Sequence, residues 1–245
     1  MKVETLKELI AARGAREGRV RVVSLVSGKE WLGTDSAELG GSPFGAVHPD
    51  LIEAVDAVLA GDRGRIVEAD SQSTSETSER DSESFFVHPF NPPVRLAIVG
   101  AVHIAQRLSI LARDLGYEVL VIDPRRGFLT EARFPGVTRS HEWPDAALEQ
   151  AQLDARSALV TLSHDPKIDQ PALEVGLRSS CFYIGALGSR RTQARRRESL
   201  LAQGFSEEML ERIHGPVGLD IGASSPAEIA LSIAAELTEC LRKPV

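Results

Sequence analysis

The residues best suited to ligand chemistry lie just after an apolar run in the middle of the chain. Residues 96–99 lead directly into Gly100-Ala101-Val102-His103, and a helical pattern follows. A turn between a strand and a helix exposes backbone N–H groups at a helix N-terminus, where phosphate groups bind. We therefore take Gly100, Ala101, Val102 and His103 as candidate cofactor-binding residues.

An acidic residue and an arginine follow the next apolar run. Asp123 lies 23 residues after Gly100, near the place where the carboxylate of a dinucleotide-binding unit accepts a ribose hydroxyl. Arg125 would suit a phosphate or another anionic ligand, or it would form a surface salt bridge. Val102 stands where the nucleotide-binding fingerprint has glycine, and its branched side chain disfavours close approach of a pyrophosphate. The pattern thus favours the scaffold of a nucleotide-binding unit more strongly than NAD(P) itself.

Polar residues also follow two later apolar runs. Ser163 and His164 come after residues 158–162, and His164 could act as an acid or base, bind a ligand or simply cap the next segment. A second glycine-containing loop follows residues 181–184 and opens a helix with two arginines. Cations at a helix N-terminus are unfavourable unless an anion binds there. The candidate cofactor-binding residues of these two loops are Ser163, His164, Gly185, Gly188, Ser189, Arg190 and Arg191.

Other chemistries have little support in the sequence. It contains no HExxH motif, Walker loop or nucleophile elbow, so we predict no catalytic residue and no metal site. The two cysteines, Cys181 and Cys240, fit neither a disulfide scaffold nor a cysteine-rich metal site. The run Arg195-Arg196-Arg197 is expected to be a solvated helix face. The glycine-rich stretch 215–223 could shape a ligand or cofactor pocket.

Composition and charge exclude several classes of protein. The chain has 245 residues, of which 42% are hydrophobic and 26% charged, so it is neither fibrous nor wholly disordered. A net charge of −7 and an aromatic content of 5% disfavour nucleic-acid binding. We find no signal peptide and no run of about 18 apolar residues that would span a membrane. The expectation is a cytoplasmic protein that binds neither nucleic acid nor membrane.

The elements that must position these residues alternate between strands and helices. Short apolar runs separated by helical stretches are typical of a parallel sheet covered by helices on both faces. Expected strands are 96–99, 119–122, 158–162 and 181–184, and expected helices are 103–115, 145–153, 168–177, 189–202 and 226–241. The predicted fold class is α/β, a Rossmann-like doubly wound parallel sheet with a small N-terminal α+β domain.

A change of composition predicts the domain boundary. Residues 69–84 hold five acidic residues, one arginine and no large apolar side chain, so we expect a mobile linker there. The predicted organisation is a small α+β domain at 1–68, an acidic serine-rich linker with a proline-rich connection at 69–93, and the Rossmann-like domain at 94–245.

Three stretches resemble the XdhC/CoxI family of accessory proteins of xanthine dehydrogenase and related molybdenum hydroxylases. They are LAIVGAVHIAQRLSILARDLGYEVLVIDPR, YIGALGSRRTQARR and GPVGLDIGASSPAEIALSIAAEL. The resemblance implies a chaperone, not an enzyme, that binds molybdopterin-type molybdenum cofactor, protects it during sulfuration and inserts it into a client. The phosphate or dinucleotide pyrophosphate of that cofactor suits the loops described above. The alternative is an NAD(P)-dependent oxidoreductase.

The resemblance also implies partners. A molybdenum hydroxylase such as xanthine dehydrogenase would receive the cofactor, a cysteine desulfurase is a second candidate partner, and a homodimer is a candidate assembly. Members of the family usually have a small N-terminal domain with a Gly-Gly-Cys-Val-Glu-like loop. Here Gly40-Gly41-Ser42 stands in its place, so a role that the cysteine has in relatives cannot be carried over.

Overall fold

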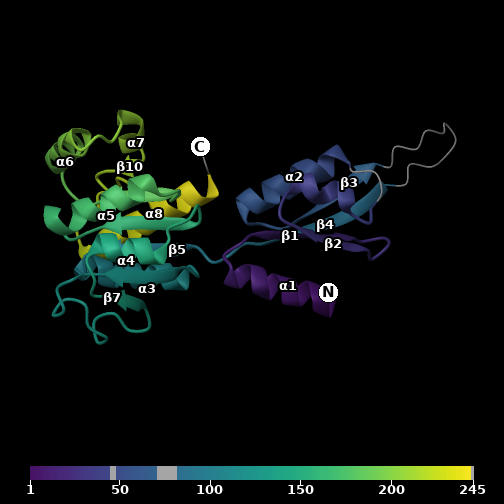
Figure 1. Cartoon of the computed structure of the whole chain (residues 1–245), viewed down its shortest axis with the longest axis horizontal. Coiled ribbons are helices and arrows are strands. Elements are labelled where there is room, and N and C mark those ends of the chain that lie inside the picture. The colour runs from purple at the N-terminus through teal and green to yellow at the C-terminus, as the bar shows by residue number, and fades with distance from the viewer. Residues whose placement is uncertain (45–47, 71–81, 244–245) are drawn as a thin grey trace. The chain divides into compact units, whose positions relative to one another are not determined.

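The chain forms two compact units, Met1–Pro92 and Pro93–Val245 (Figure 1). The computed structural model describes residues 1–44, 48–70 and 82–243. Each unit has a hydrophobic core of its own, and the candidate loops all lie in the second unit.

The first unit is an antiparallel sheet packed with helices. Its strands are β1 (Arg19–Ser24), β2 (Glu30–Gly33), β3 (Arg65–Asp70) and β4 (Ser82–Phe90), in the order β2-β1-β4-β3. The helices are α1 (Val3–Gly14), α2 (Pro49–Gly61) and the 3-10 helix η1 (Ser36–Gly41). Alternate residues of β1 and β4 pack against α2, and the buried core includes Val20, Val22, Leu51, Val55, Phe85 and Val87. This small unit is the expected α+β module.

The expected linker contains a strand. Residues 82–90 form β4, which pairs with both β1 and β3 and so lies in the middle of the small sheet. Phe85 and Val87 are fully buried there, although acidic and serine residues precede them in the sequence. Residues 71–81 of the expected linker lie outside the described residues. The structure therefore divides the chain between Pro92 and Pro93.

The second unit is built on a parallel sheet. Its strands are β5 (Arg95–Val99), β6 (Glu118–Ile122), β7 (Thr138–Ser140), β8 (Ser157–Thr161), β9 (Tyr183–Ala186) and β10 (Ile213–His214). They are arranged β10-β9-β8-β5-β6-β7, and all of their pairings are parallel. The helices are α3 (His103–Asp114), α4 (Pro144–Ala151), α5 (Pro166–Arg178), α6 (Arg190–Ala202), α7 (Glu207–Glu211) and α8 (Pro226–Arg242). This strand order is that of a Rossmann fold, and the predicted fold class is confirmed.

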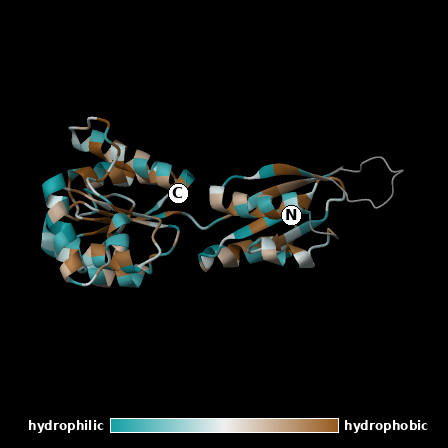
Figure 2. Ribbon diagram, turned by 90° about the horizontal axis from the view of Figure 1, so that it is seen from above, coloured by the Kyte–Doolittle hydropathy of each residue, from teal (hydrophilic) through white to brown (hydrophobic). Residues whose placement is uncertain are grey.

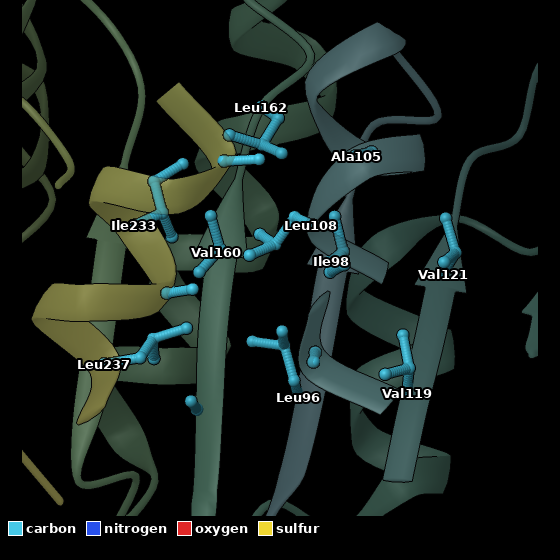
Figure 3. Close-up of a cluster of buried hydrophobic side chains, with 14 of the residues drawn as sticks. Leu96, Ile98, Ala105, Leu108, Val119, Val121, Val160, Leu162, Ile233 and Leu237 are labelled. Carbon is cyan, nitrogen blue, oxygen red and sulfur yellow. The ribbon is translucent and has the colours of Figure 1, made fainter. Parts of the chain in front are cut away.

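Helices cover both faces of this sheet. Leu96 and Ile98 of β5 belong to a core that includes Leu108 of α3 and Ile233 of α8 (Figure 3). Ala97 and Val99, the intervening residues, belong to the opposite core with residues of α4 and α5. Successive residues of a strand point to opposite faces, which explains why the buried strands are apolar without alternation. The apolar strands within the helical layers are visible in Figure 2.

Leu108 gives a test of this packing because its side chain is fully buried between α3, α8 and the sheet. Leu108→Ala is expected to lower the free energy of unfolding by about 2–5 kcal/mol through lost burial and a cavity. Urea unfolding followed by circular dichroism measures this. Leu115→Ala is the control, because Leu115 is 51% exposed, and it should change stability by about 0.5 kcal/mol or less. Equal effects of the two variants would contradict the packing described.

Candidate functional site

The loops after β5 and β8 meet at the carboxyl edge of the parallel sheet. The chain leaves β5 toward β6 and β7 on one side, and later returns to place β8 on the other side of β5. Such a switch point is where open α/β sheets bind ligands. Gly100 has φ +103°, and a Cβ atom there would lie 2.6 Å from the backbone nitrogen of Ser163. The two loops are thus in direct contact, and only glycine fits at position 100.

A buried carboxylate fixes the loop after β5. Asp123 is fully buried, and its Oδ2 accepts a hydrogen bond from the Ala101 N–H at 2.7 Å. The same carboxylate accepts three hydrogen bonds from Arg125, through the backbone N–H, Nε and Nη2. Each carboxylate oxygen therefore accepts two hydrogen bonds, which is the capacity of an ionised carboxylate.

These contacts give Asp123 and Arg125 a role within the protein, and the ion pair is the salt-bridge alternative expected for Arg125. Burial alone would raise the pKa of Asp123, but the hydrogen bonds from Arg125 and from the Ala101 and Arg125 amides outweigh it and hold the pKa below its usual value. The carboxylate has no acceptor site left for a ribose hydroxyl. Arg125 is engaged in part, because Nε and Nη2 donate to Asp123 and the guanidinium lies 4.4 Å from the centre of the Phe128 ring, while the side chain stays 34% exposed. Both residues position the loop in this structure.

The backbone amides of the first turn are also engaged. Gly100 N–H donates to the carbonyl of Ile122 at 2.9 Å, and Val102 N–H donates to the carbonyl of Gly100 at 3.0 Å. Val102 precedes α3 with φ −89°, so no left-handed conformation is required of this branched residue. His103 is exposed as the first residue of α3. The N–H groups of Gly100, Ala101 and Val102 are therefore all paired. Of the backbone N–H groups in this described region, those in the first turn of helix α3 remain for an anion.

The loop after β8 combines an exposed histidine with a buried acid. His164 is exposed and adopts φ +63°, a conformation that is uncommon outside glycine. Ser163 donates to Asp169 Oδ1 from its hydroxyl at 2.6 Å and from its backbone N–H at 3.2 Å. Asp169 is 2% exposed, and burial raises its pKa. Ser163 therefore anchors the loop on α5 while His164 faces outward.

The loop after β9 divides into a buried part and an exposed part. Gly185 lies within β9, where a Cβ would lie 2.5 Å from the side chain of Val217, so it packs against protein rather than ligand. Gly188 has φ +139°, and Ser189 caps α6 by accepting a hydrogen bond from the Thr192 N–H. Arg190 and Arg191 follow, both exposed, and neither makes a hydrogen bond or ion pair with a described residue.

Arg196 is the main residue that sequence reasoning missed. It lies in the run expected to be a solvated face, yet its side chain is 11% exposed. Its guanidinium donates to the carbonyl of Leu187 and to Gln193, and lies 3.9 Å from Asp169. Desolvation lowers the pKa of Arg196, since the ion pair with Asp169 is not tight. Arg195 and Arg197 are exposed as expected. Arg196 thus ties α6 and the loop after β9 to α5.

The glycine-rich stretch 215–223 is held by a polar network at α8. Glu236 accepts hydrogen bonds from the Gly218 N–H at 2.7 Å and from the Tyr183 hydroxyl, and contacts His214 Nδ1 at 3.2 Å. Burial opposes ionisation of Glu236, but these bonds, first that of His214, hold its pKa below the usual value. Burial raises the pKa of Tyr183. This loop is therefore fixed against β9 and α8.

Two cavities of the second unit lie at opposite edges of the sheet. A cavity of about 310 Å³ lies between α5 and α6, at the carboxyl edge, and includes His164 and Arg196 in its wall. A larger one of about 610 Å³ adjoins the first residues of β5 and β6, at the amino edge, away from the candidate loops. Among the described residues no three metal-ligating side chains gather in one place. No helix in the described part of the chain is both long and apolar enough to cross a membrane.

Asp123→Asn tests whether the hydrogen bonds of Asp123 to Ala101 and Arg125 stabilise the loop after β5. The amide cannot accept all four hydrogen bonds, so the free energy of unfolding at pH 7 should fall by about 1–3 kcal/mol. The folded-state pKa of Asp123 is depressed, so its carboxylate stabilises the fold above the unfolded-state pKa, about 4. This stabilisation is lost as the pH falls through the folded-state pKa. Urea unfolding of the native chain and of Asp123→Asn should show a smaller difference in the free energy of unfolding at low pH than at pH 7. A difference in the free energy of unfolding that does not change with pH would contradict a stabilising role of the ionised Asp123 carboxylate.

Comparison with known proteins identifies relatives. Residues 96–237 match a family model described as the XdhC Rossmann domain. The chain is 31% identical over 161 residues to a probable xanthine dehydrogenase subunit of Bacillus subtilis (strain 168), covering 65% of this chain and 47% of that protein. It is 34% identical over 148 residues to the molybdenum cofactor insertion chaperone PaoD of Escherichia coli (strain K12), covering 60% and 40%. The uncharacterized protein YqeB of the same strain is 34% identical over 154 residues, covering 62% and 28%.

The chain thus spans less than half the length of these curated relatives. A crystal structure described as a xanthine dehydrogenase from Bacillus halodurans shares the fold, with a TM-score of 0.69 and 23% identity over 99% of this chain and 65% of that one. Because the family model extends from β5 into α8 and covers more than half of the sequence, the chain belongs to the XdhC family.

Proposed function

We propose that this chain is an accessory protein that binds molybdenum cofactor. In this role it assists sulfuration of the cofactor and its insertion into a xanthine dehydrogenase-type molybdenum hydroxylase. Membership of the XdhC family and the name of the PaoD relative support the proposal. The observation that carries it is the pair Arg190 and Arg191, which make no hydrogen bond or ion pair with a described residue at the start of α6, in a chain of net charge −7.

The chemistry of the exposed groups fits the anionic end of that cofactor. A pterin phosphate or a dinucleotide pyrophosphate is a strong hydrogen-bond acceptor, and guanidinium groups recognise it through several N–H donors. His164 adds an imidazole at the same carboxyl edge of the sheet. The bound cofactor would supply the molybdenum, and the residues of this chain would bind and orient its anionic end.

The chain itself offers little chemistry for the transfer of sulfur. A thiolate is the reactive form of cysteine, but burial raises the pKa of both the Cys181 and the Cys240 thiol. Ser42 supplies a hydroxyl in the loop where the family resemblance implies a cysteine. The role that we propose is therefore that of a cofactor-binding chaperone rather than an enzyme, with the sulfur provided by a partner such as a cysteine desulfurase.

The second candidate ligand, NAD(P), is disfavoured by the contacts of the first turn. The carboxylate of Asp123 is saturated by Ala101 and Arg125. The N–H groups of Gly100 and Val102 are already bonded to backbone carbonyls. A dinucleotide would have to displace these hydrogen bonds before its ribose and pyrophosphate could bind in the usual way. An NAD(P)-dependent oxidoreductase is therefore the weaker candidate.

The proposal predicts that Arg190→Ala combined with Arg191→Ala weakens cofactor binding several-fold, because two guanidinium donors at the anionic end are lost. Equilibrium dialysis of the full chain against molybdopterin-type cofactor measures the dissociation constant. Arg197→Ala is a matched control, since Arg197 lies on the same helix and pairs with the exposed Glu207, and it should leave binding unchanged. If the double variant binds as tightly as the native chain, these arginines do not bind the cofactor.

The family resemblance also leads us to propose two assemblies. A client of the xanthine dehydrogenase type would receive the cofactor from this chain, and two copies of the chain would form a homodimer. Light scattering after size-exclusion chromatography gives the mass of the particle, which we expect to be twice the 26.5 kDa of one chain. A mass of one chain at micromolar concentration would remove the homodimer from the proposal.

A further inference from the structure

The cavity between α5 and α6 lies beside the candidate loops after β8 and β9, and no residue of the first turn after β5 lines it. Its volume is about 310 Å³. One wall comes from α5 and the loop before it, and the other from the first turns of α6. The residues that line it are His164, Pro166, Asp169, Gln170, Thr192, Arg195, Arg196 and Ser199. Most of them can donate a hydrogen bond, so the cavity is suited to a polar ligand.

Two arginines, one histidine and one acid line this cavity. Arg195 makes no hydrogen bond or ion pair with a described residue, and His164 likewise makes no hydrogen bond or salt bridge within the described part of the chain. Arg196 is nearly buried and meets Asp169 only at 3.9 Å. Asp169 is the single acid of the wall, and its Oδ1 is already used by the hydroxyl and N–H of Ser163. The wall thus holds two guanidinium groups and one acid, and an anionic ligand would pair with the guanidinium groups.

Hydrogen bonds between the surrounding elements define the walls of the cavity. Gln170 and Ser199 exchange hydrogen bonds between the two helices at 3.0 and 3.2 Å. Arg196 is fixed by Leu187 and Gln193. The donors thus reach the cavity from three places, α5, α6 and the loop before α5, which suits an oxyanion that accepts hydrogen bonds from several sides. The α5 and α6 helices both begin at this edge, and their N-terminal dipoles favour an anion.

We infer that this cavity binds the dianionic phosphate of a phosphate monoester, held by Arg195, Arg196, His164 and Thr192. A volume of about 310 Å³ is at the lower limit for small-molecule pockets, so it can take the phosphate and its ester neighbours but not a whole dinucleotide. The anion site rests on the geometry alone. Its assignment to the terminal phosphate of a pterin cofactor rests on the proposed function.

Titration calorimetry of the full chain with inorganic phosphate at constant ionic strength tests the site. Arg195→Ala should raise the dissociation constant about tenfold, because a charge-assisted hydrogen bond is lost. His164→Gly should weaken binding several-fold and still fold, since glycine accepts the φ of +63°. Arg197→Ala, with the same loss of charge on α6, should stay within about twofold of the native value. Native-like binding by both Arg195→Ala and His164→Gly, or no binding by the native chain, would overturn the inference.

Two monoesters test the charge of the ligand. Methyl phosphate, a dianion above its second pKa of about 6, should bind like inorganic phosphate, whereas methyl sulfate, a monoanion, should bind about tenfold more weakly. Equal binding would overturn the assignment to a dianion.

The same variants separate this inference from the proposed function. Binding of intact pterin cofactor should exceed binding of the phosphatase-treated cofactor, and Arg195→Ala should reduce this difference. If the native chain binds phosphate through Arg195 but does not bind the cofactor, the anion site stands and the proposed function fails. If the cofactor binds equally well with and without its phosphate, cofactor binding stands, but the assignment of the cofactor phosphate to this cavity fails.

Discussion

The carboxylate of Asp123 determines what the first turn of this Rossmann unit can bind. It joins the end of β6 to the loop after β5 through Ala101, and it holds Arg125 against the same loop. In a dinucleotide-binding unit the corresponding acid serves the ligand, whereas here it serves the protein. The turn lies where a Rossmann unit binds a nucleotide. Its carboxylate and its backbone N–H groups are instead hydrogen-bonded within the protein.

The loops after β8 and β9, beyond the switch point, carry exposed polar side chains that a ligand could reach. His164 after β8 and Arg190 and Arg191 after β9 are exposed. Arg195 and Arg196 line the cavity between α5 and α6. The bond between Ser163 and Asp169 fixes the loop that carries His164, and the bond between Arg196 and Leu187 fixes Arg196. Fixed donors lose less conformational freedom when a ligand binds.

The sequence was sufficient to predict the fold because its strongest patterns are local. Residues 96–99 and 158–162 are apolar on both faces, and helical stretches separate them, so a doubly wound sheet follows from periodicity. The strand β4 was harder to predict as a central strand. Serine and acidic residues precede Phe85, and its burial depends on pairing with β1 and β3, which lie elsewhere in the sequence.

The site was only partly predictable, and for a different reason. The sequence correctly predicted that Asp123, Arg125 and His164 lie at the carboxyl edge, but it could not show that Arg125 and Ala101 together occupy the carboxylate of Asp123. Arg196 lies in an arginine run on a helix of which Leu200 is the fully buried residue, so composition favoured solvent exposure. Its burial depends on the carbonyl of Leu187 and on Asp169, which are contacts of the tertiary structure.

The central claim is that the loops after β8 and β9, and not the turn after β5, bind the ligand. The ligand we propose is a pterin phosphate and not a dinucleotide. Competition dialysis measures this most directly: the full chain is exposed to equal concentrations of molybdopterin-type cofactor and NADPH, and the retained species is identified by mass spectrometry. The account predicts retention of the pterin with its phosphate. Retention of NADPH in preference to the pterin would contradict it.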